Sequence, residues 1–474
     1  MAEISNDVFF ATIPELNARL KAREFSAEDL ARAFALRLEQ LGPRYNALAL
    51  PLVQEAIRKG QTTDKDIRRG RLRGPLQGIP YAVKDLLSYA GQPTTWGARP
   101  YAAQVFDYNA TVITKLSSVG AVLTGKLSMI ELAGGGGYRT AAASLTGPGL
   151  NPWDRTRWSG GSSSGPGAAV AAGLVTFAIG SETSGSIVCP ASFCGVTALR
   201  PTYGLVSRHG AMALAWTLDK VGPFCRSAED CGLVLEEIAG GDSKDPGSAG
   251  KSFYYTPQYT RPLKELRIGY APVDIAEWAD PSARPAFEAA IETLKQSGVQ
   301  LVETKLPDFP YGTILSAILT AECASVFEPL ITSGKVDELA DPAQIAGLKA
   351  SLDIAAKDYL KAMRVRRLMQ EAFSKLFVDI HALVAPGYLT PAPLVSKALD
   401  GAPRSSTPKD PGFTSLIPAS NLAGLPALVL PCGLAEKMPV AIQLVGRPFT
   451  ENTLLAMGKD FQSRTDWHKR RPPV

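Results

Sequence analysis

Apolar residues recur at helical spacing in three long segments of the chain. Residues 12–22 and 26–41 repeat them every three or four positions near the amino terminus, and residues 357–379 do so in the second half. Ser26 followed by Asp29 is typical of a capping box, in which two side chains satisfy the first backbone amides of a helix. The pattern predicts amphipathic helices, the first two of which cover a sheet.

From residue 74 the sequence pattern changes to short apolar runs separated by Gly, Pro and Asn. The runs at 79–83 and 121–123 have the length of buried strands, and helical stretches alternate with them. Such alternation is typical of α/β proteins, in which helices cover the faces of a sheet. We therefore expect an α/β fold.

The longest uncharged apolar stretch is flanked by two clusters of Ser and Gly. Pro166 suits the first turn of a helix and Gly173 its end, and residues 174–179 then form a strand. Ser/Gly clusters also occur in flexible linkers, but the segment between these two is too regular for a linker. One helix and one strand bring the serines at 162–164 close to a loop at 180–186.

Two further segments, 241–262 and 387–411, are rich in Gly, Pro, Ser and charged residues and are expected to be loops. A loop as long as the second is uncommon inside a compact domain. It predicts either a lid or binding loop over a site or a disordered insert.

A serine nucleophile needs a base, and the usual base is histidine. The chain has only His209, His381 and His468. The residues around Ser163 match the G-x-S-x-G nucleophile elbow, but that elbow directly follows a strand. Residues 151–158 are expected to form a polar loop, so we interpret the match as accidental.

Lysine can also activate serine when burial or nearby cations lower its pKa. Lys84 ends the apolar run at 79–83, where it would lose solvation. The alternative is that Lys84 only pairs with Asp85 at the end of the strand. The local sequence leaves both interpretations open.

Charge and composition exclude several classes of function. The 50 basic and 45 acidic residues give a net charge of only +5, which argues against a nucleic-acid partner. No amino-terminal signal segment is evident, and the stretch at 167–180 is too short to cross a bilayer. Residues 120–127 resemble a phosphate-binding loop, but Leu127 replaces the Ser or Thr that would hold magnesium. We expect no membrane, nucleotide or other cofactor.

The cysteines are too few and too scattered for a disulfide scaffold or a zinc site, and reduced thiols in the cytoplasm fit them best. They are Cys189, Cys194, Cys225, Cys231, Cys323 and Cys432.

Several motifs occur in the order found in the amidase-signature family, which the chain resembles over most of its length. They are GIPYAVKD at 78–85, NPWD at 151–154, GGSSSGPGAAVAAG at 160–173, GSETSGSIVCPASFCGVTALRPTYG at 180–204, SNLAGLPALVLPCG at 420–433 and QLVGRP at 443–448. Their order and the 24-residue step from Ser162 to Ser186 make the resemblance specific.

The resemblance implies a catalytic triad. Ser186 is then the nucleophile, Ser162 a bridging serine that follows a cis peptide bond, and Lys84 the terminal base. Ser186 would pass its proton through Ser162 to neutral Lys84 while it attacks a carbonyl carbon, and the relay would return a proton to the leaving amine.

The resemblance also implies residues around the triad. The oxyanion hole would consist of the backbone amides of Thr183, Ser184, Gly185 and Ser186. The substrate would be bound by Ser163 and by a pocket-shaping loop that contains Ala133, Gly134 and Gly135, although a flexible turn explains those glycines equally well.

Three positions depart from the family pattern. Glu182 stands where Asp is common, Ser184 where Gly is common, and Val188 where Arg is frequent. None belongs to the implied triad. The serine could alter the oxyanion loop, because glycine tolerates backbone angles that serine resists.

The resemblance implies one domain over residues 1–474, with a mixed sheet between helical layers, amino-terminal helices in residues 1–60 and the signature core at 74–230. We expect a free-standing serine amidohydrolase that acts through an acyl-enzyme on small-molecule amides, either aryl or alkyl amides or carbamates (urethanes). Likeness to relatives is compatible with a homodimer, but no exposed apolar stripe in the sequence establishes one, so the oligomeric state stays open. The alternatives are the glutaminase subunit of a tRNA-dependent amidotransferase and a non-catalytic binding protein that retains the fold.

Overall fold

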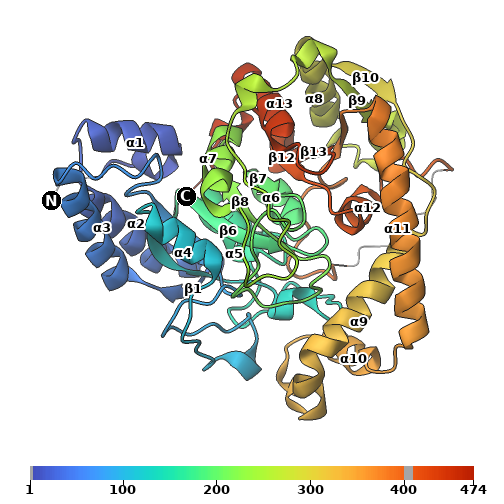
Figure 1. Cartoon of the computed structure of the whole chain (residues 1–474), viewed down its shortest axis with the longest axis horizontal. Coiled ribbons are helices and arrows are strands. Elements are labelled where there is room, and N and C mark those ends of the chain that lie inside the picture. The colour runs from blue at the N-terminus through green and yellow to red at the C-terminus, as the bar shows by residue number, and fades with distance from the viewer. Residues whose placement is uncertain (1–3, 400–408, 474) are drawn as a thin grey trace.

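The chain folds around one large mixed sheet, to which both halves of the sequence contribute strands (Figure 1). The computed structural model describes residues 4–399 and 409–473. Within them the sheet has 11 strands in the order β1-β3-β2-β6-β8-β7-β12-β13-β11-β9-β10. The strands are β1 Leu48–Pro51, β2 Pro80–Lys84, β3 Val122–Leu127, β6 Phe177–Glu182, β7 Thr197–Arg200, β8 Lys220–Cys225, β9 Arg267–Tyr270, β10 Gln300–Glu303, β11 Ala382–Pro386, β12 Ala427–Ala435 and β13 Met438–Gly446.

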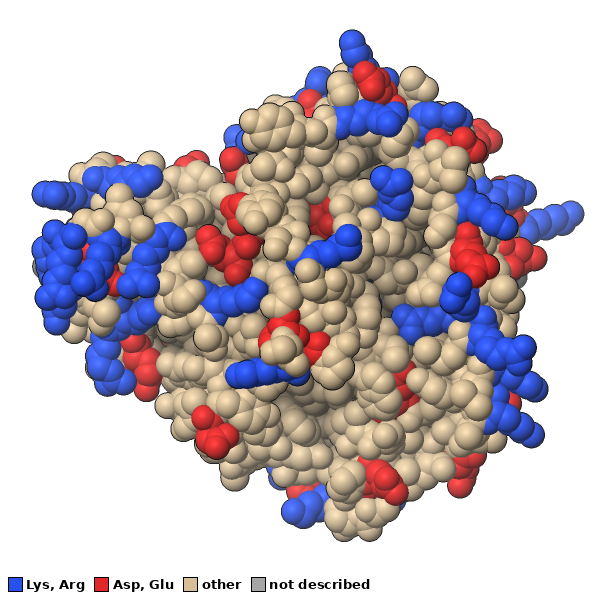
Figure 2. Space-filling model, viewed as in Figure 1, with Lys and Arg blue, Asp and Glu red and all other residues tan. Residues whose placement is uncertain are grey.

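Helices cover the sheet and confirm the predicted α/β class. They are α1 Ile13–Lys21, α2 Ala27–Leu41, α3 Val53–Arg68, α4 Thr111–Ser118, α5 Ser164–Ala171, α6 Val188–Cys194, α7 Ala228–Ile238, α8 Arg284–Gln296, α9 Tyr311–Thr332, α10 Pro342–Ser351, α11 Ala356–Asp379, α12 Leu416–Leu422 and α13 Glu451–Arg464. In Figure 1, α1 to α3 gather at one end of the molecule and α9 to α11 at the other. Lys and Arg side chains are prominent at both ends in Figure 2, whereas the middle of this face is mixed in charge.

The amino-terminal helices form as their sequence predicts. Ser26 is the N-cap of α2, and its Oγ accepts a hydrogen bond from the Asp29 amide at 3.0 Å while Asp29 reaches back to the Ser26 amide. The apolar face of α2 packs against α3 and β3. Phe34 is fully buried there, in edge-to-face contact with Phe9 at 5.0 Å between ring centroids. The long helix predicted at 357–379 is α11.

Two predicted elements differ from the structure. The strand expected at 174–179 begins at Phe177 and continues to Glu182, because residues 180–182 pair with β8. The expected polar loop at 151–158 is instead a hairpin of β4, Leu150–Asn151, and β5, Asp154–Trp158. Its polar, partly exposed side chains lack the apolar alternation that identifies a half-buried strand.

The two expected loops are irregular where they are described. Residues 241–262 contain no more than a 3-10 turn at Pro257–Tyr259. The segment that follows β11 is fastened by several backbone hydrogen bonds, which include those from the Val395 amide to the Thr156 carbonyl and from the Leu399 amide to the Arg139 carbonyl. Residues 400–408 of the expected lid lie outside the described residues, so the lid stays a prediction.

One helix among the described residues, α9, is long and apolar enough to cross a bilayer by length and composition. In its most apolar 18-residue window 44% of the residues are buried, and the core helix of a soluble protein passes the same test. Its Glu322 is buried and accepts hydrogen bonds from the amide and hydroxyl of Thr217 at 3.0 and 2.6 Å. Such contacts are typical of a helix that packs inside a protein.

We expect Phe34→Ala to lower the free energy of unfolding by about 3–5 kcal/mol, because the substitution leaves a cavity in the contact between α2 and the core. Chemical denaturation would measure the loss. Phe34→Leu, which keeps most of the apolar volume, is the matched control and should cost clearly less. Equal stability of the alanine variant and the wild type would show that this helical layer does not contribute to the cooperative core.

Candidate active site

Lys84 lies at the carboxyl end of β2, between the neighbouring strands β3 and β6, and is fully buried. Its Nζ donates hydrogen bonds to Ser162 Oγ at 2.7 Å and to Ser181 Oγ at 3.0 Å. Burial lowers the pKa of Lys84 to about 7, although the carboxylates of Asp219 and Glu182 act in the opposite direction. A substantial fraction of this lysine is therefore neutral near physiological pH.

Asp85 does not pair with Lys84. Its carboxylate lies 2.7 Å from the ammonium of Lys126, on the adjacent strand β3, and both side chains are buried. Lys126 also donates to the carbonyl of Pro93 at 2.8 Å. The alternative in which Lys84 and Asp85 neutralise each other is therefore wrong, because Asp85 already has a cation.

Ser162 and Ser163 occupy the turn that leads into α5. The Gly161–Ser162 peptide bond is cis, and the Ser162 carbonyl accepts a hydrogen bond from the Ile130 amide at 3.1 Å. Ser163 Oγ donates to the Ser181 carbonyl at 3.1 Å and accepts from the Ser181 amide at 3.4 Å. Ser163 thus fastens this turn to β6, and both Ser162 and Ser181 are brought to Lys84.

Ser186 follows β6 in a short loop that ends where α6 begins. Glu182, the last residue of β6, reaches across the loop: its Oε2 accepts hydrogen bonds from the amides of Ile187 at 2.7 Å and Val188 at 2.9 Å. This contact closes the loop and fixes its far end. Ser186 itself is 8% exposed, and none of the described hydrogen bonds joins it to Ser162.

The same carboxylate is held from behind by two side chains that are distant in sequence. Glu182 Oε1 accepts from Arg200 of β7 at 2.6 Å and from Asn421 of α12 at 2.7 Å. Burial by itself would raise the pKa of Glu182, but Arg200, the Val188 amide and Asn421 together hold it at about 2. The carboxylate is therefore ionised at any physiological pH.

The structure accommodates the three departures from the family pattern. Glu182 spans the loop, and Val188 contributes its amide while its side chain is buried. Ser184 does not have a positive φ, whereas Gly185 has φ of 88°. The serine therefore stands where no left-handed backbone is needed, and it strains the loop little.

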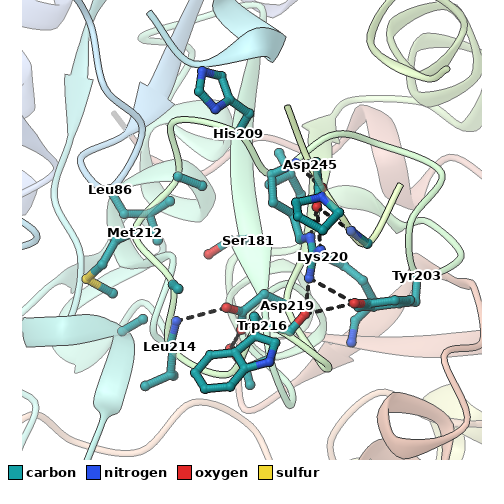
Figure 3. A pocket seen from close by; sticks show the side chains of 18 of the residues that line it. Leu86, Ser181, Tyr203, His209, Met212, Leu214, Trp216, Asp219, Lys220 and Asp245 are labelled. Atoms are coloured by element: carbon teal, nitrogen blue, oxygen red, sulfur yellow. Dashed lines mark hydrogen bonds and ion pairs between the residues drawn. The ribbon is translucent and has the colours of Figure 1, made fainter. Parts of the chain in front are cut away.

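A cavity of about 410 Å³ opens beside Ser181 and Thr183 (Figure 3). Ala133 lies in its wall, where a residue that shapes a substrate pocket would be, but Gly134 and Gly135 do not line it. A Cβ on Gly134 would lie 2.7 Å from the Tyr138 ring, and one on Gly135 would lie 2.8 Å from Cys323 Sγ. These glycines permit close packing of the loop rather than an open pocket.

The histidines are not placed to activate these serines. His209 lines the outer part of the cavity and stacks on Tyr108 at 5.5 Å between ring centroids. His381 Nδ1 accepts a hydrogen bond from the Arg267 amide. No described hydrogen bond links a histidine to Ser162, Ser163 or Ser186. The contacts of the described residues therefore do not support activation of these serines by histidine.

Sequence reasoning missed four residues of the site: Ser181, Arg200, Asp219 and Asn421. Ser181 and Arg200 lie within the quoted signature motifs, and Asn421 lies in a later one, but the motifs do not reveal their partners. Asp219, in the segment TLDK, carried no signal. Only the register of β8 against β6, which pairs Lys220 with Glu182, places it at the site.

A large mixed sheet that carries a buried lysine on a serine hydroxyl is the framework of an amidase-type hydrolase of carbon–nitrogen bonds. The chain belongs to the amidase family, whose model matches residues 29–455.

Individual relatives cover nearly the whole chain. The sequence is 38% identical to the A subunit of glutamyl-tRNA(Gln) amidotransferase from Synechococcus sp. strain JA-2-3B'a(2-13), over 98% of this chain and 94% of the relative. The solved A subunit from Thermotoga maritima superposes with a TM-score of 0.78 at 27% identity, covering 98% of this chain and 96% of that one. The peptide amidase from Stenotrophomonas maltophilia superposes with a TM-score of 0.84 at 30% identity, covering 98% of both chains.

These relatives correct two expectations. The prediction of a free-standing hydrolase of non-peptide amides and carbamates is wrong, because curated relatives at 34–38% identity over nearly the full chain are named as the A subunit of an amidotransferase. The expected set of partners, limited to a small-molecule amide or carbamate and a second copy of the chain, is wrong on the same ground, because it leaves out other protein subunits. A subunit functions within an assembly, and the names of these relatives include glutamyl-tRNA.

We expect Glu182→Gln to lower the free energy of unfolding by about 3–5 kcal/mol, because it leaves the buried guanidinium of Arg200 without a charge partner. Glu182→Asp, which keeps the charge, is the control and should cost less. Denaturant titration at pH 7 would measure both.

The pKa of Glu182 lies below its ordinary value of 4.5. Its ionised form therefore contributes stability above that ordinary value, and the contribution is lost as the pH falls towards about 2. A glutamine variant as stable as the wild type at pH 7 would contradict the importance of this charge.

Proposed function

We propose that the chain is the amide-hydrolysing subunit of a glutamyl-tRNA amidotransferase and releases ammonia from the side chain of glutamine. The observation that carries the proposal is the likeness to the A subunit of that enzyme over 98% of this chain at 38% identity. The site supports it independently, since Lys84 and Ser162 are in hydrogen-bonding contact in a buried setting suited to acyl transfer.

In the proposed reaction Ser186 attacks the carboxamide carbon of glutamine. Its proton passes to Ser162, whose own proton passes to neutral Lys84 across the 2.7 Å contact. Collapse of the tetrahedral intermediate breaks the carbon–nitrogen bond, and the relay returns a proton so that ammonia leaves. Water then hydrolyses the γ-glutamyl ester on Ser186 by the same relay in reverse, giving glutamate.

The negative oxygen of the intermediate would be bound by the backbone amides of Thr183, Ser184, Gly185 and Ser186. Such amides stabilise the transition state because they are already oriented before charge develops on the oxygen. Glu182 contributes by fixing the end of the loop that carries them. Ser163 has a supporting role, because it fastens the Ser162 turn to β6.

The proposal also places the protein in the cytoplasm, where glutamyl-tRNA is made. All six cysteines are free and buried, which fits a reducing compartment. Ammonia is a small product that another subunit would consume, so the proposed role requires a protein partner.

Reconstitution with the remaining subunits of a related bacterial amidotransferase tests the role directly. The wild-type chain should support conversion of glutamyl-tRNA to glutaminyl-tRNA with glutamine as the nitrogen donor. Ser186→Ala should abolish this reaction but retain conversion with added ammonium, because only ammonia release is lost. Failure of the wild type to assemble with those subunits or to turn over glutamine would overturn the proposed role.

The pH dependence should report Lys84. Because neutral lysine is the proton acceptor, kcat/KM for glutamine should rise as the pH increases through about 7, the pKa of Lys84. Lys84→Ala should reduce kcat by about 10²- to 10⁴-fold, the usual contribution of general acid–base catalysis. Lys84→Arg is the matched control: it keeps the cation but cannot lose its proton, so it should be as inactive as alanine at every pH. Substantial activity of the arginine variant would exclude Lys84 as the base.

A further inference from the structure

Asp219 lines the cavity and faces the backbone of Leu214 (Figure 3). Its Oδ1 accepts a hydrogen bond from Thr183 Oγ1 at 2.6 Å. Its Oδ2 accepts from the amides of Leu214 at 2.8 Å and Ala215 at 3.1 Å. One carboxylate therefore joins the first residue of the catalytic loop to a backbone segment in the wall of the cavity.

The three described partners of Asp219 are all hydrogen-bond donors, and none is a cation. The neighbouring Lys220 donates to the carbonyl of Leu218 rather than to this carboxylate, and no ion pair of Asp219 occurs among the described residues. A group that only accepts hydrogen bonds is thus required at this position. An amide side chain would present an N–H to at least one donor.

The two ends of the loop are anchored differently. Glu182 holds the far end through the amides of Ile187 and Val188. At the near end, Thr183 is anchored through its side chain, and the anchor is Asp219. Loss of this contact would leave the first amide of the loop free to turn while the other end stays fixed.

We propose that Asp219 is a positioning residue that orients the Thr183 amide for binding of the oxyanion and couples the cavity wall at Leu214 to it. This inference rests on the proposed catalytic role of the Ser186 loop but not on glutamine as the substrate. It goes beyond the triad because Asp219 acts through Thr183 and does not itself touch the reacting atoms.

The test uses the rate at which a serine-directed fluorophosphonate labels Ser186, because labelling needs the nucleophile and the oxyanion hole but not the physiological amide. Asp219→Asn and Thr183→Val should each slow labelling about 10-fold or more, and Thr183→Ser should be labelled faster than Thr183→Val because it keeps the hydroxyl that donates to Asp219. Complete removal of one oxyanion donor typically lowers the rate by about 10²- to 10³-fold. This is the upper limit for the slowing of labelling in these variants. The double variant should be no slower than the slower single variant, since both remove one contact.

Thr183→Val separates this role from two others. It leaves the carboxyl group of Asp219 in place, so its effect does not come from removing that group from the surroundings of Lys84. It also leaves the contacts to Leu214 and Ala215, so it remains informative if Asp219→Asn unfolds. When an amide that the enzyme hydrolyses is the substrate, the variants should have a lower kcat and a KM within about threefold of the wild type. This is the pattern expected when a transition-state interaction is lost.

Wild-type labelling rates in Thr183→Val, or effects of the two substitutions that multiply in the double variant, would overturn the proposal. A chain that labels normally but does not hydrolyse glutamine would contradict the proposed function while leaving the Asp219 test intact.

Discussion

The loop that carries Ser186 depends on one buried ion pair, between Glu182 and Arg200. Removing two charges from water is costly unless each is fully paired, and here Glu182 has four hydrogen-bond donors: Ile187, Val188, Arg200 and Asn421. Because those donors belong to the loop itself, to β7 and to α12, a single carboxylate sets the relative position of three parts of the fold. The loop needs no further contact at its far end.

Two fully buried lysines on neighbouring strands differ in the partners of their ammonium groups. Lys126 has a carboxylate partner, Asp85, and contributes structure. Among the described residues Lys84 hydrogen-bonds only to the hydroxyls of Ser162 and Ser181, so no carboxylate in contact with it offsets the burial that lowers its pKa. A buried lysine alone therefore does not define the chemistry of the site. The residues that contact its ammonium group do.

The features that could be predicted from the sequence are those that depend on the local pattern of apolar and polar residues. Helical periodicity located α1, α2 and α11, and the apolar run before Lys84 located a buried strand with a lysine at its end. The partners of Glu182 and Thr183 could not be predicted, because β6 meets Arg200, Asp219 and Asn421 only through strand register and long-range packing. The hairpin at 150–158 was missed because its polar surface strands lack apolar alternation. The expectation of a free-standing hydrolase was wrong because the motifs identify the amidase-signature family as a whole, whereas the similarity over nearly the full chain is to proteins named as the A subunit of an amidotransferase.

The contact between Glu182 and Asn421 spans 239 residues of sequence. During synthesis, the strand that carries Glu182 leaves the ribosome long before α12, and β12, which pairs with β7, is made later still. A nascent chain therefore holds Lys84, Ser162 and Ser186 without the support that fixes their loop. The contacts that fix the Ser186 loop thus await nearly complete translation, so a truncated product would carry the signature motifs yet lack this support.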